Sequence, residues 1–166
     1  LQQAGIEFEE GQHDETRILN ADEVMKSPGI PDKNELVKKI RAKGIDIISE
    51  IELAYRFKGD SRIIGITGSN GKTIVKEWLN QLLEDDYRII RSPKSYNSQI
   101  GVPLSVWPLN ASHELGIFEA GISQSGEMER LQRIILPTIG IFTNIGEAHS
   151  ENFLNERQKV NEKLRL

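Results

Sequence analysis

The sequence predicts an α/β fold of three layers, in which helices cover both faces of a mostly parallel β-sheet. Two observations lead to this expectation. Short apolar runs of strand length alternate with segments of helical periodicity through most of the 166 residues. A glycine-rich turn at 68–71 also joins an apolar strand directly to an amphipathic helix, which is how a βα unit begins.

The first 59 residues are predicted to form a small domain of their own. Its expected elements are a strand at 6–9, a strand at 23–26, a helix from 32 to 44, a strand at 45–48 and a helix at 50–57. Asp32 is the expected N-cap of the first helix because Glu35 follows three residues later. The polar run 58–60 then separates two domains, 1–59 and 60–166.

The remainder of the chain is predicted to contain the main sheet. Its expected strands are apolar and lie at Arg62–Thr67, 87–91, Leu115–Glu119 and 139–143. Its expected helices lie at Lys72–Leu83, 126–135 and 155–166, and a long loop is expected from 92 to 103. In the first of these helices, Val75, Trp78, Leu79 and Leu82 recur on one face, which is predicted to pack on the sheet.

The composition argues against several classes of function. A net charge of −4 disfavours a sequence-independent grip on nucleic acid, and the absence of cysteine excludes disulfides, thiolate metal sites and cysteine nucleophiles. No apolar run is long enough to cross a membrane and no signal-peptide pattern occurs, so we expect no membrane insertion. A cysteine-free chain fits a reducing compartment, and the expected localisation is cytoplasmic.

The segment Gly68-Ser69-Asn70-Gly71-Lys72-Thr73 has the composition of a phosphate-binding loop. Two glycines allow a tight turn whose N–H groups point at phosphate oxygens, and the following helix adds the positive end of its dipole. Lys72 would neutralise the β- and γ-phosphates of ATP, and the Thr73 hydroxyl would ligate Mg²⁺. The spacing is shorter than the usual Gly-x-x-x-x-Gly-Lys-Ser/Thr, because residue 66 is isoleucine. The alternative is a βα turn with an incidental lysine; the flanking strand and helix favour a nucleotide loop.

Three further segments extend the loop into a family pattern. They are Tyr-Asn-Ser-Gln-Ile-Gly-Val-Pro at 96–103, Phe-Glu-Ala-Gly at 118–121 and Thr-Asn-Ile-Gly-Glu-Ala-His at 143–149. Together with 66–73, and in this order, they resemble the central domain of the Mur ligases. This resemblance implies an ATP-dependent amide ligase of peptidoglycan precursor synthesis, with a P-loop mononucleotide-binding unit.

The two halves of the chain resemble different members of that family. Residues 62–166 resemble the member that adds D-alanyl-D-alanine to a UDP-N-acetylmuramoyl tripeptide. Residues 1–60 resemble the UDP-binding, Rossmann-like N-terminal domain of the D-glutamate-adding member. That domain is expected to be partial here, because its first strand and glycine-rich turn are missing, and the family's C-terminal domain is expected to be absent.

The resemblance also implies roles for individual residues. Glu119 and His149 would contact Mg²⁺, and Lys163, fourteen residues after His149, would be a carbamylated lysine that helps to hold the metal. Lys72, His149 and Lys163 form the implied catalytic set. Asn144 would contact the nucleotide, Asn97 the muramoyl substrate and Gly29 the uracil ring. From the residues alone, Glu119 could instead be a solvated strand-end carboxylate, and Lys163 could belong to a solvated helix face.

Three functions therefore remain open on the sequence. The first is the D-alanyl-D-alanine-adding ligase, with ATP and Mg²⁺ as cofactors and a UDP-N-acetylmuramoyl peptide and D-alanyl-D-alanine as substrates. The second is a related ligase that adds D-glutamate, or one of folylpolyglutamate type. The third is a nucleotide-binding module without catalytic activity.

Overall fold

The structure is a computed structural model that describes residues 5–27, 29–147 and 149–166. The chain divides into two compact units, Leu1–Leu53 and Ala54–Leu166, slightly before the expected boundary at 59 and 60. Among the described residues, none of the helices combines the length and the apolar character that a membrane crossing requires.

The N-terminal unit contains a two-stranded parallel sheet. Strand β1 (Glu23–Met25) pairs with β2 (Asp46–Ile48) in parallel. The elements around them are α1 (Glu15–Ile18), α2 (Glu35–Ala42), which connects the two strands, and the start of α3 (Glu50–Arg56). Val37 and Ile40 of α2 are buried, so the predicted amphipathic helix is present.

Two local predictions for this unit are wrong. Residues 6–9 are exposed and form no strand, and no described strand forms a sheet with them. The N-cap of α2 is Asn34, whose Oδ1 accepts the N–H of Leu36 at 2.9 Å. Asp32 instead forms an exposed ion pair with Arg41 at 3.1 Å. A side chain at residue 34 lies closer to the first free N–H groups of the helix, so it takes the capping position.

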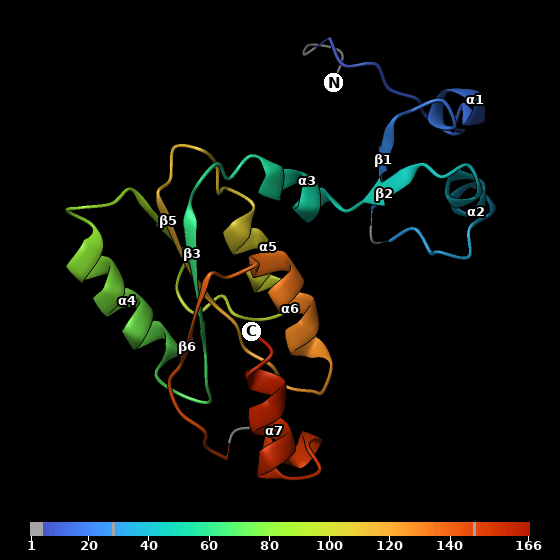
Figure 1. The fold of residues 1–166 in the computed structure, drawn as a ribbon. Helices are drawn as coiled ribbons and strands as arrows, with labels where there is room; N and C mark the ends of the chain where they lie inside the picture. The colour runs from blue at the N-terminus through green and yellow to red at the C-terminus, as the bar shows by residue number, and fades with distance from the viewer. Residues whose placement is uncertain (1–4, 28, 148) are drawn as a thin grey trace. The chain divides into compact units, whose positions relative to one another are not determined.

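The larger unit has the predicted three-layer α/β fold (Figure 1). Its four strands are parallel, in the order β4 (Ile89–Arg91), β5 (Leu115–Glu119), β3 (Arg62–Thr67) and β6 (Ile139–Phe142). Strand β3 lies inside the sheet, and every residue of it after Arg62 is buried. This accounts for its continuous apolar run, because a parallel strand with both faces covered shows no polar alternation.

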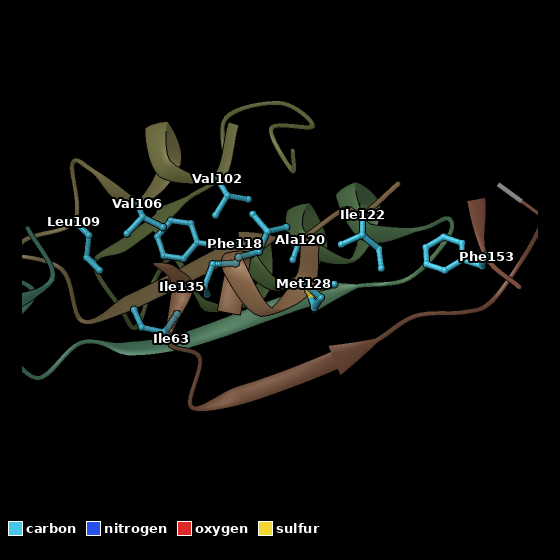
Figure 2. Packing of buried hydrophobic residues seen from close by; sticks show 11 residues of the cluster. Ile63, Val102, Val106, Leu109, Phe118, Ala120, Ile122, Met128, Ile135 and Phe153 are labelled. Carbon is cyan, nitrogen blue, oxygen red and sulfur yellow. The ribbon is translucent and has the colours of Figure 1, made fainter. Parts of the chain in front are cut away.

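Helices cover both faces of this sheet (Figure 1). Helix α4 (Lys72–Leu83) packs on one face, where Ile64, Ile66 and Ile117 form a buried cluster. Helices α5 (Gly101–Val106) and α6 (Glu127–Ile135) pack on the other face. Figure 2 shows the larger cluster on that side, which contains Ile63, Val102, Val106, Leu109, Phe118, Ala120, Ile122, Met128, Leu131, Ile135 and Phe153.

Helix α5 was not predicted, because its Pro103 indicated the end of a loop. Pro103 lies in the first turn of the helix, where a missing backbone N–H breaks no intrahelical hydrogen bond. Val102 and Val106 are both buried beside it. The segment therefore gains its helical conformation from burial on the sheet rather than from its own propensity.

Helix α4 is rotated relative to the predicted packing. Val75 and Leu79 contact the core as predicted, but Trp78 and Leu82 are 57% and 74% exposed. The buried positions include Lys76 and Asn80. Polar groups of strand β4 and its neighbours supply partners for both side chains, so the helix buries polar residues that a hydrophobic pattern places in solvent.

Helix α7 (Glu156–Lys163) is attached to the domain by charged side chains. Lys159, Glu162 and Lys163 are its buried residues and share one face by their spacing. Glu162 Oε1 accepts the N–H of Gly126 at 2.6 Å and that of Met128 at 3.4 Å, so it caps the N-terminus of α6. This contact fixes α7 and holds Lys163 against the turn that follows β3.

Candidate functional site

The 68–73 loop lies at the carboxyl end of β3, between that strand and α4. Gly68 has a φ of 142°, and a Cβ built on it would lie 2.0 Å from Thr143 Oγ1, so a larger residue does not fit. Gly71, with a φ of 81°, begins α4 without a side-chain cap. The first N–H groups of α4 therefore have no intrahelical partner. They form, with the positive end of the helix dipole, a site that can bind an anion.

The segment after β6 holds this loop in place. The N–H of Ser69 donates to the Asn144 carbonyl at 2.9 Å, and the N–H of Asn70 donates to Asn144 Oδ1 at 2.9 Å. The Thr143 hydroxyl contacts the carbonyls of Asn70 and Thr67 at 2.6 and 3.2 Å. Asn144, which was predicted to contact the nucleotide, thus lies beside the loop and engages its backbone.

A Thr143→Val substitution is expected to destabilise the chain by about 1–2 kcal/mol, because it keeps the side-chain shape and removes the hydroxyl that contacts the carbonyls of Thr67, at the end of β3, and Asn70, in the loop. Urea unfolding measures this difference. Thr16→Val is the matched control: Thr16 is exposed in α1, and its hydroxyl has no hydrogen-bond partner among the described residues, whereas its backbone N–H donates to Asp14. Equal free energies of unfolding for Thr143→Val and the parent chain would contradict the assigned role of this hydroxyl.

Three lysines converge around the same loop. Lys72 Nζ donates to the carbonyls of Gly68 and Ser69 at 2.9 and 3.2 Å, and Lys163 Nζ donates to Gly68 at 3.2 Å. Lys159 Nζ, which the sequence analysis did not select, donates to the carbonyl of Gly146 at 2.5 Å and is buried. Lys163 is also buried, so a solvated helix face does not describe its position. Three ammonium groups therefore surround the loop, and their hydrogen bonds go to uncharged oxygens.

This arrangement changes the acidity of two of the lysines. Burial, reinforced by the positive charges of Lys72 and Lys159, lowers the pKa of Lys163 to about 8. Burial also lowers the pKa of Lys72, and the charge of Glu119 partly opposes that change. Near neutral pH, Lys163 therefore has a larger fraction of neutral amine than an exposed lysine has, and the neutral amine is the form that reacts with CO₂.

The Lys163 shift predicts a pH dependence of stability. Since its pKa is lower in the folded state, the unfolded chain binds more protons above about pH 8, and the contribution of Lys163 to stability rises with pH. Between roughly pH 7.5 and 9.5 we expect this contribution to rise by about 2 kcal/mol. Denaturant unfolding of the parent chain and Lys163→Met measures it as a difference. Parallel pH profiles for the two proteins would contradict the shift.

Glu119 brings a second group of residues together at the end of β5. Its side chain is fully buried, so it is not a solvated strand-end carboxylate. Glu119 Oε2 accepts from the Thr73 hydroxyl at 3.1 Å and from Asn97 Nδ2 at 3.3 Å. Lys76 Nζ lies 3.1 Å from Glu119 Oε1 as an ion pair. Thr73 and Asn97, which were selected from the sequence, thus both contact the Glu119 carboxylate, which was also selected. Lys76, which was not selected, contacts it as well.

Asn97 is itself fixed beside the end of β5. The N–H of Gly121 donates to the Asn97 carbonyl at 2.7 Å, and a Cβ on Gly121 would lie 2.6 Å from Asn97 Oδ1. The small residue after β5 therefore allows the Asn97 side chain to approach Glu119. This pairing explains why the asparagine and the following Glu-Ala-Gly segment both belong to the site.

The two remaining residues selected from the sequence are His149 and Gly29. His149 is exposed, with a φ of 59°, and begins the short 3₁₀-helix Ser150–Asn152. Within the described ranges, no three His, Cys, Asp or Glu side chains converge as a metal cluster. Gly29 belongs to the N-terminal unit, where Lys26 and Ile30 on either side of it line a cavity of about 720 Å³.

Comparisons with known proteins identify relatives of this chain. Residues 66–166 match the family model of the Mur ligase middle domain. The UDP-N-acetylmuramoyl-tripeptide–D-alanyl-D-alanine ligase of Treponema pallidum is 48% identical over 86 residues, which are 52% of this chain and 19% of that protein. The UDP-N-acetylmuramoylalanine–D-glutamate ligase of Christiangramia forsetii is 38% identical over 153 residues, which are 92% of this chain and 32% of that protein.

A solved structure shares the fold. MurF ligase from Thermotoga maritima, in complex with ADP, superposes with a TM-score of 0.62 at 24% identity, over 88% of this chain and 40% of that one. The chain spans about a fifth to a third of the length of the two curated relatives named above. Because the family model covers most of the sequence, including the 68–73 loop, Glu119 and Lys163, this chain belongs to the Mur ligase family.

Proposed function

We propose that this chain is the nucleotide-binding part of an ATP-dependent amide ligase that acts on peptidoglycan precursors. The observation that carries the proposal is the 68–73 loop, in which the uncapped start of α4 and the half-buried ammonium of Lys72 create an anion site at the end of β3. The ADP complex of the related Thermotoga maritima ligase supports a nucleotide as the anion. The phosphates of ATP would contact the free N–H groups of α4 and the ammonium of Lys72.

Thr73 and Glu119 are the residues that would hold Mg²⁺. They fit a hard cation, because a hydroxyl and a buried carboxylate lie 3.1 Å apart. The buried Thr67 Oγ1 also has no hydrogen-bond partner among the described residues. His149 and a carbamylated Lys163 are the further proposed ligands. When bound, the ion would neutralise negative charge on the phosphates.

The proposed reaction has two steps. A carboxylate oxygen of the muramoyl peptide attacks the γ-phosphorus of ATP, and the products are an acyl phosphate and ADP. An amine then attacks the acyl carbon, and inorganic phosphate leaves as the amide forms. The chain contributes positioning and charge neutralisation, as in other phosphoryl transfers. Lys72 would hold the transferred phosphate, and Asn97, fixed between Gly121 and Glu119, would orient the muramoyl substrate.

The proposed substrates are a UDP-N-acetylmuramoyl tripeptide and D-alanyl-D-alanine. The 48% identity to the Treponema pallidum ligase supports this choice. The Christiangramia forsetii ligase, which matches across most of this chain, supports the D-glutamate-adding alternative. In either case the cavity of the N-terminal unit beside Gly29 is the proposed site for the uridine group.

Phosphate release with a panel of substrates tests the proposal. The chain, ATP and Mg²⁺ are incubated either with the tripeptide and D-alanyl-D-alanine or with UDP-N-acetylmuramoyl-L-alanine and D-glutamate, and Lys72→Ala is the control. We expect release only with the first pair and only from the parent chain. Release with the second pair would favour the D-glutamate-adding ligase. ATP binding without release for either pair would leave a nucleotide-binding module.

A further inference from the structure

Lys76 is a fully buried cation in α4, one turn after Thr73. Its Nζ lies 3.1 Å from Glu119 Oε1, and both side chains are completely excluded from solvent. It also donates to the carbonyl of Ser92 at 2.8 Å and to the carbonyl of Lys94. A buried ammonium requires such a full set of partners, since leaving a buried charge uncompensated is strongly unfavourable.

The segment after β4 supplies two carbonyl acceptors for this ammonium. Ser92 is buried, and its Oγ accepts the N–H of Glu119 at 3.0 Å while its carbonyl accepts from Lys76. Lys94 has a φ of 51°, a left-handed conformation that is unfavourable for a residue with a side chain. Its carbonyl accepts from Lys76 in this conformation. The ammonium therefore joins α4, the end of β5 and the start of the loop that carries Asn97.

The two oxygens of Glu119 have different surroundings as a result. Oε1 is engaged by the ion pair with Lys76, and Oε2 receives the hydrogen bonds from Thr73 and Asn97. The ion pair fixes the plane of the carboxylate, because one oxygen stays beside the buried ammonium of Lys76 while the other faces Thr73 and Asn97.

We propose that Lys76 is a positioning residue, which holds Glu119 through Oε1 so that Oε2 faces Thr73 and Asn97 and is ready to bind the divalent cation. This inference rests on the proposed nucleotide and Mg²⁺ site, and it assigns to Lys76 a role that the reaction scheme does not use. Lys76 touches neither nucleotide nor substrate in this assignment. It acts through the carboxylate and through the backbone at 92–94.

The energetic part of the proposal is tested by a double-mutant cycle of Lys76→Met and Glu119→Gln, using denaturant unfolding without nucleotide. We expect Lys76→Met to raise the unfolding equilibrium constant at least about 100-fold in the parent chain and less than about tenfold in the Glu119→Gln background.

Glu77→Gln is the matched control, because Glu77 also lies 3.1 Å from Lys76 Nζ but is 38% exposed. In the Glu77→Gln background the effect of Lys76→Met should stay near its parental value. Equal effects of Lys76→Met in the parent and Glu119→Gln backgrounds would overturn the proposal.

The positioning part is tested by the Mg²⁺ dependence of ADP binding. Lys76→Gln is the suitable variant, since it keeps a donor near Ser92 and removes the charge. We expect its dissociation constant for ADP in EDTA to stay within about twofold of the parent value, because the 68–73 loop is unchanged. We expect the improvement of binding by Mg²⁺ to shrink at least about tenfold. Glu77→Gln should keep the full improvement.

A purely structural lysine would change ADP binding equally with and without Mg²⁺, or not at all, and either result in a folded variant would overturn the positioning role. Absence of ADP binding by the parent chain would instead contradict the proposed function. In that case the double-mutant cycle, which needs no nucleotide, still decides whether Lys76 and Glu119 are coupled.

Discussion

Lys72→Ala is expected to weaken ATP binding at least about 100-fold. Its ammonium lies within the 68–73 loop and hydrogen-bonds to the carbonyls of Gly68 and Ser69, so it is held where the phosphates are proposed to bind. Hydrogen bonds to charged groups contribute about 1.5–3 kcal/mol each, and Lys72 would contact two phosphate groups. Displacement of a fluorescent ATP analogue measures the loss.

The matched control for this variant is Lys38→Ala. Lys38 is an exposed lysine of α2 in the N-terminal unit and pairs only with Glu35 among the described residues. It removes the same charge from the chain, so it corrects for a general electrostatic effect. Similar affinities for the parent chain, Lys38→Ala and Lys72→Ala would show that the loop is not the nucleotide site.

Gly68→Ala is expected to destabilise the chain by about 3 kcal/mol or more, with loss of ATP binding at temperatures where it still folds. The added Cβ would lie 2.0 Å from Thr143 Oγ1 and about as close to the backbone of Asn144 as a non-bonded contact allows, at 3.1 Å. The φ of 142° adds backbone strain for any residue with a Cβ. Either the loop or the segment after β6 must shift. Thermal and denaturant unfolding measure the effect.

Gly140→Ala provides the comparison for that substitution. Gly140 lies in β6, its φ is not positive, and apart from its chain neighbours no described residue has an atom within 4 Å of the Cβ position. We expect its free energy of unfolding to stay within about 0.5 kcal/mol of the parent value. A Gly68→Ala chain as stable as Gly140→Ala would mean that the loop conformation described here is wrong.

The parts of the site that follow from local pattern could be predicted from the sequence. Strand β3, the loop and α4 are adjacent in the chain, and the apolar run, the two glycines and the helical periodicity each indicate one of them. Glu119 ends an apolar strand, so the sequence also placed it at the carboxyl edge of the sheet, where ligands bind in open α/β folds.

The parts that depend on distant partners could not be predicted in this way. Lys76 carries no signal of burial, because the carboxylate and carbonyls that compensate its charge come from β5 and from the segment after β4. The same is true of Lys159, which donates to the carbonyl of Gly146. A hydrophobic pattern treats both as solvent-facing, and it therefore placed Trp78 on the buried side of α4.

The position of α7 could not be predicted for the same reason. Its buried face consists of Lys159, Glu162 and Lys163, and Glu162 caps α6, a contact that no periodicity indicates. The sequence predicted Lys163 only through family resemblance. The structure adds its contact with Gly68 and its burial, and that burial, with the positive charges of Lys72 and Lys159, lowers the pKa of Lys163.

The most direct test of the central claim, that the 68–73 loop binds the phosphates of ATP, is a calorimetric titration of the parent chain with ATP, first with Mg²⁺ and then with EDTA. We predict saturable binding at one site, weakened when EDTA removes the metal. A chain that is folded by circular dichroism and gives no saturable heat of binding under either condition would contradict the claim.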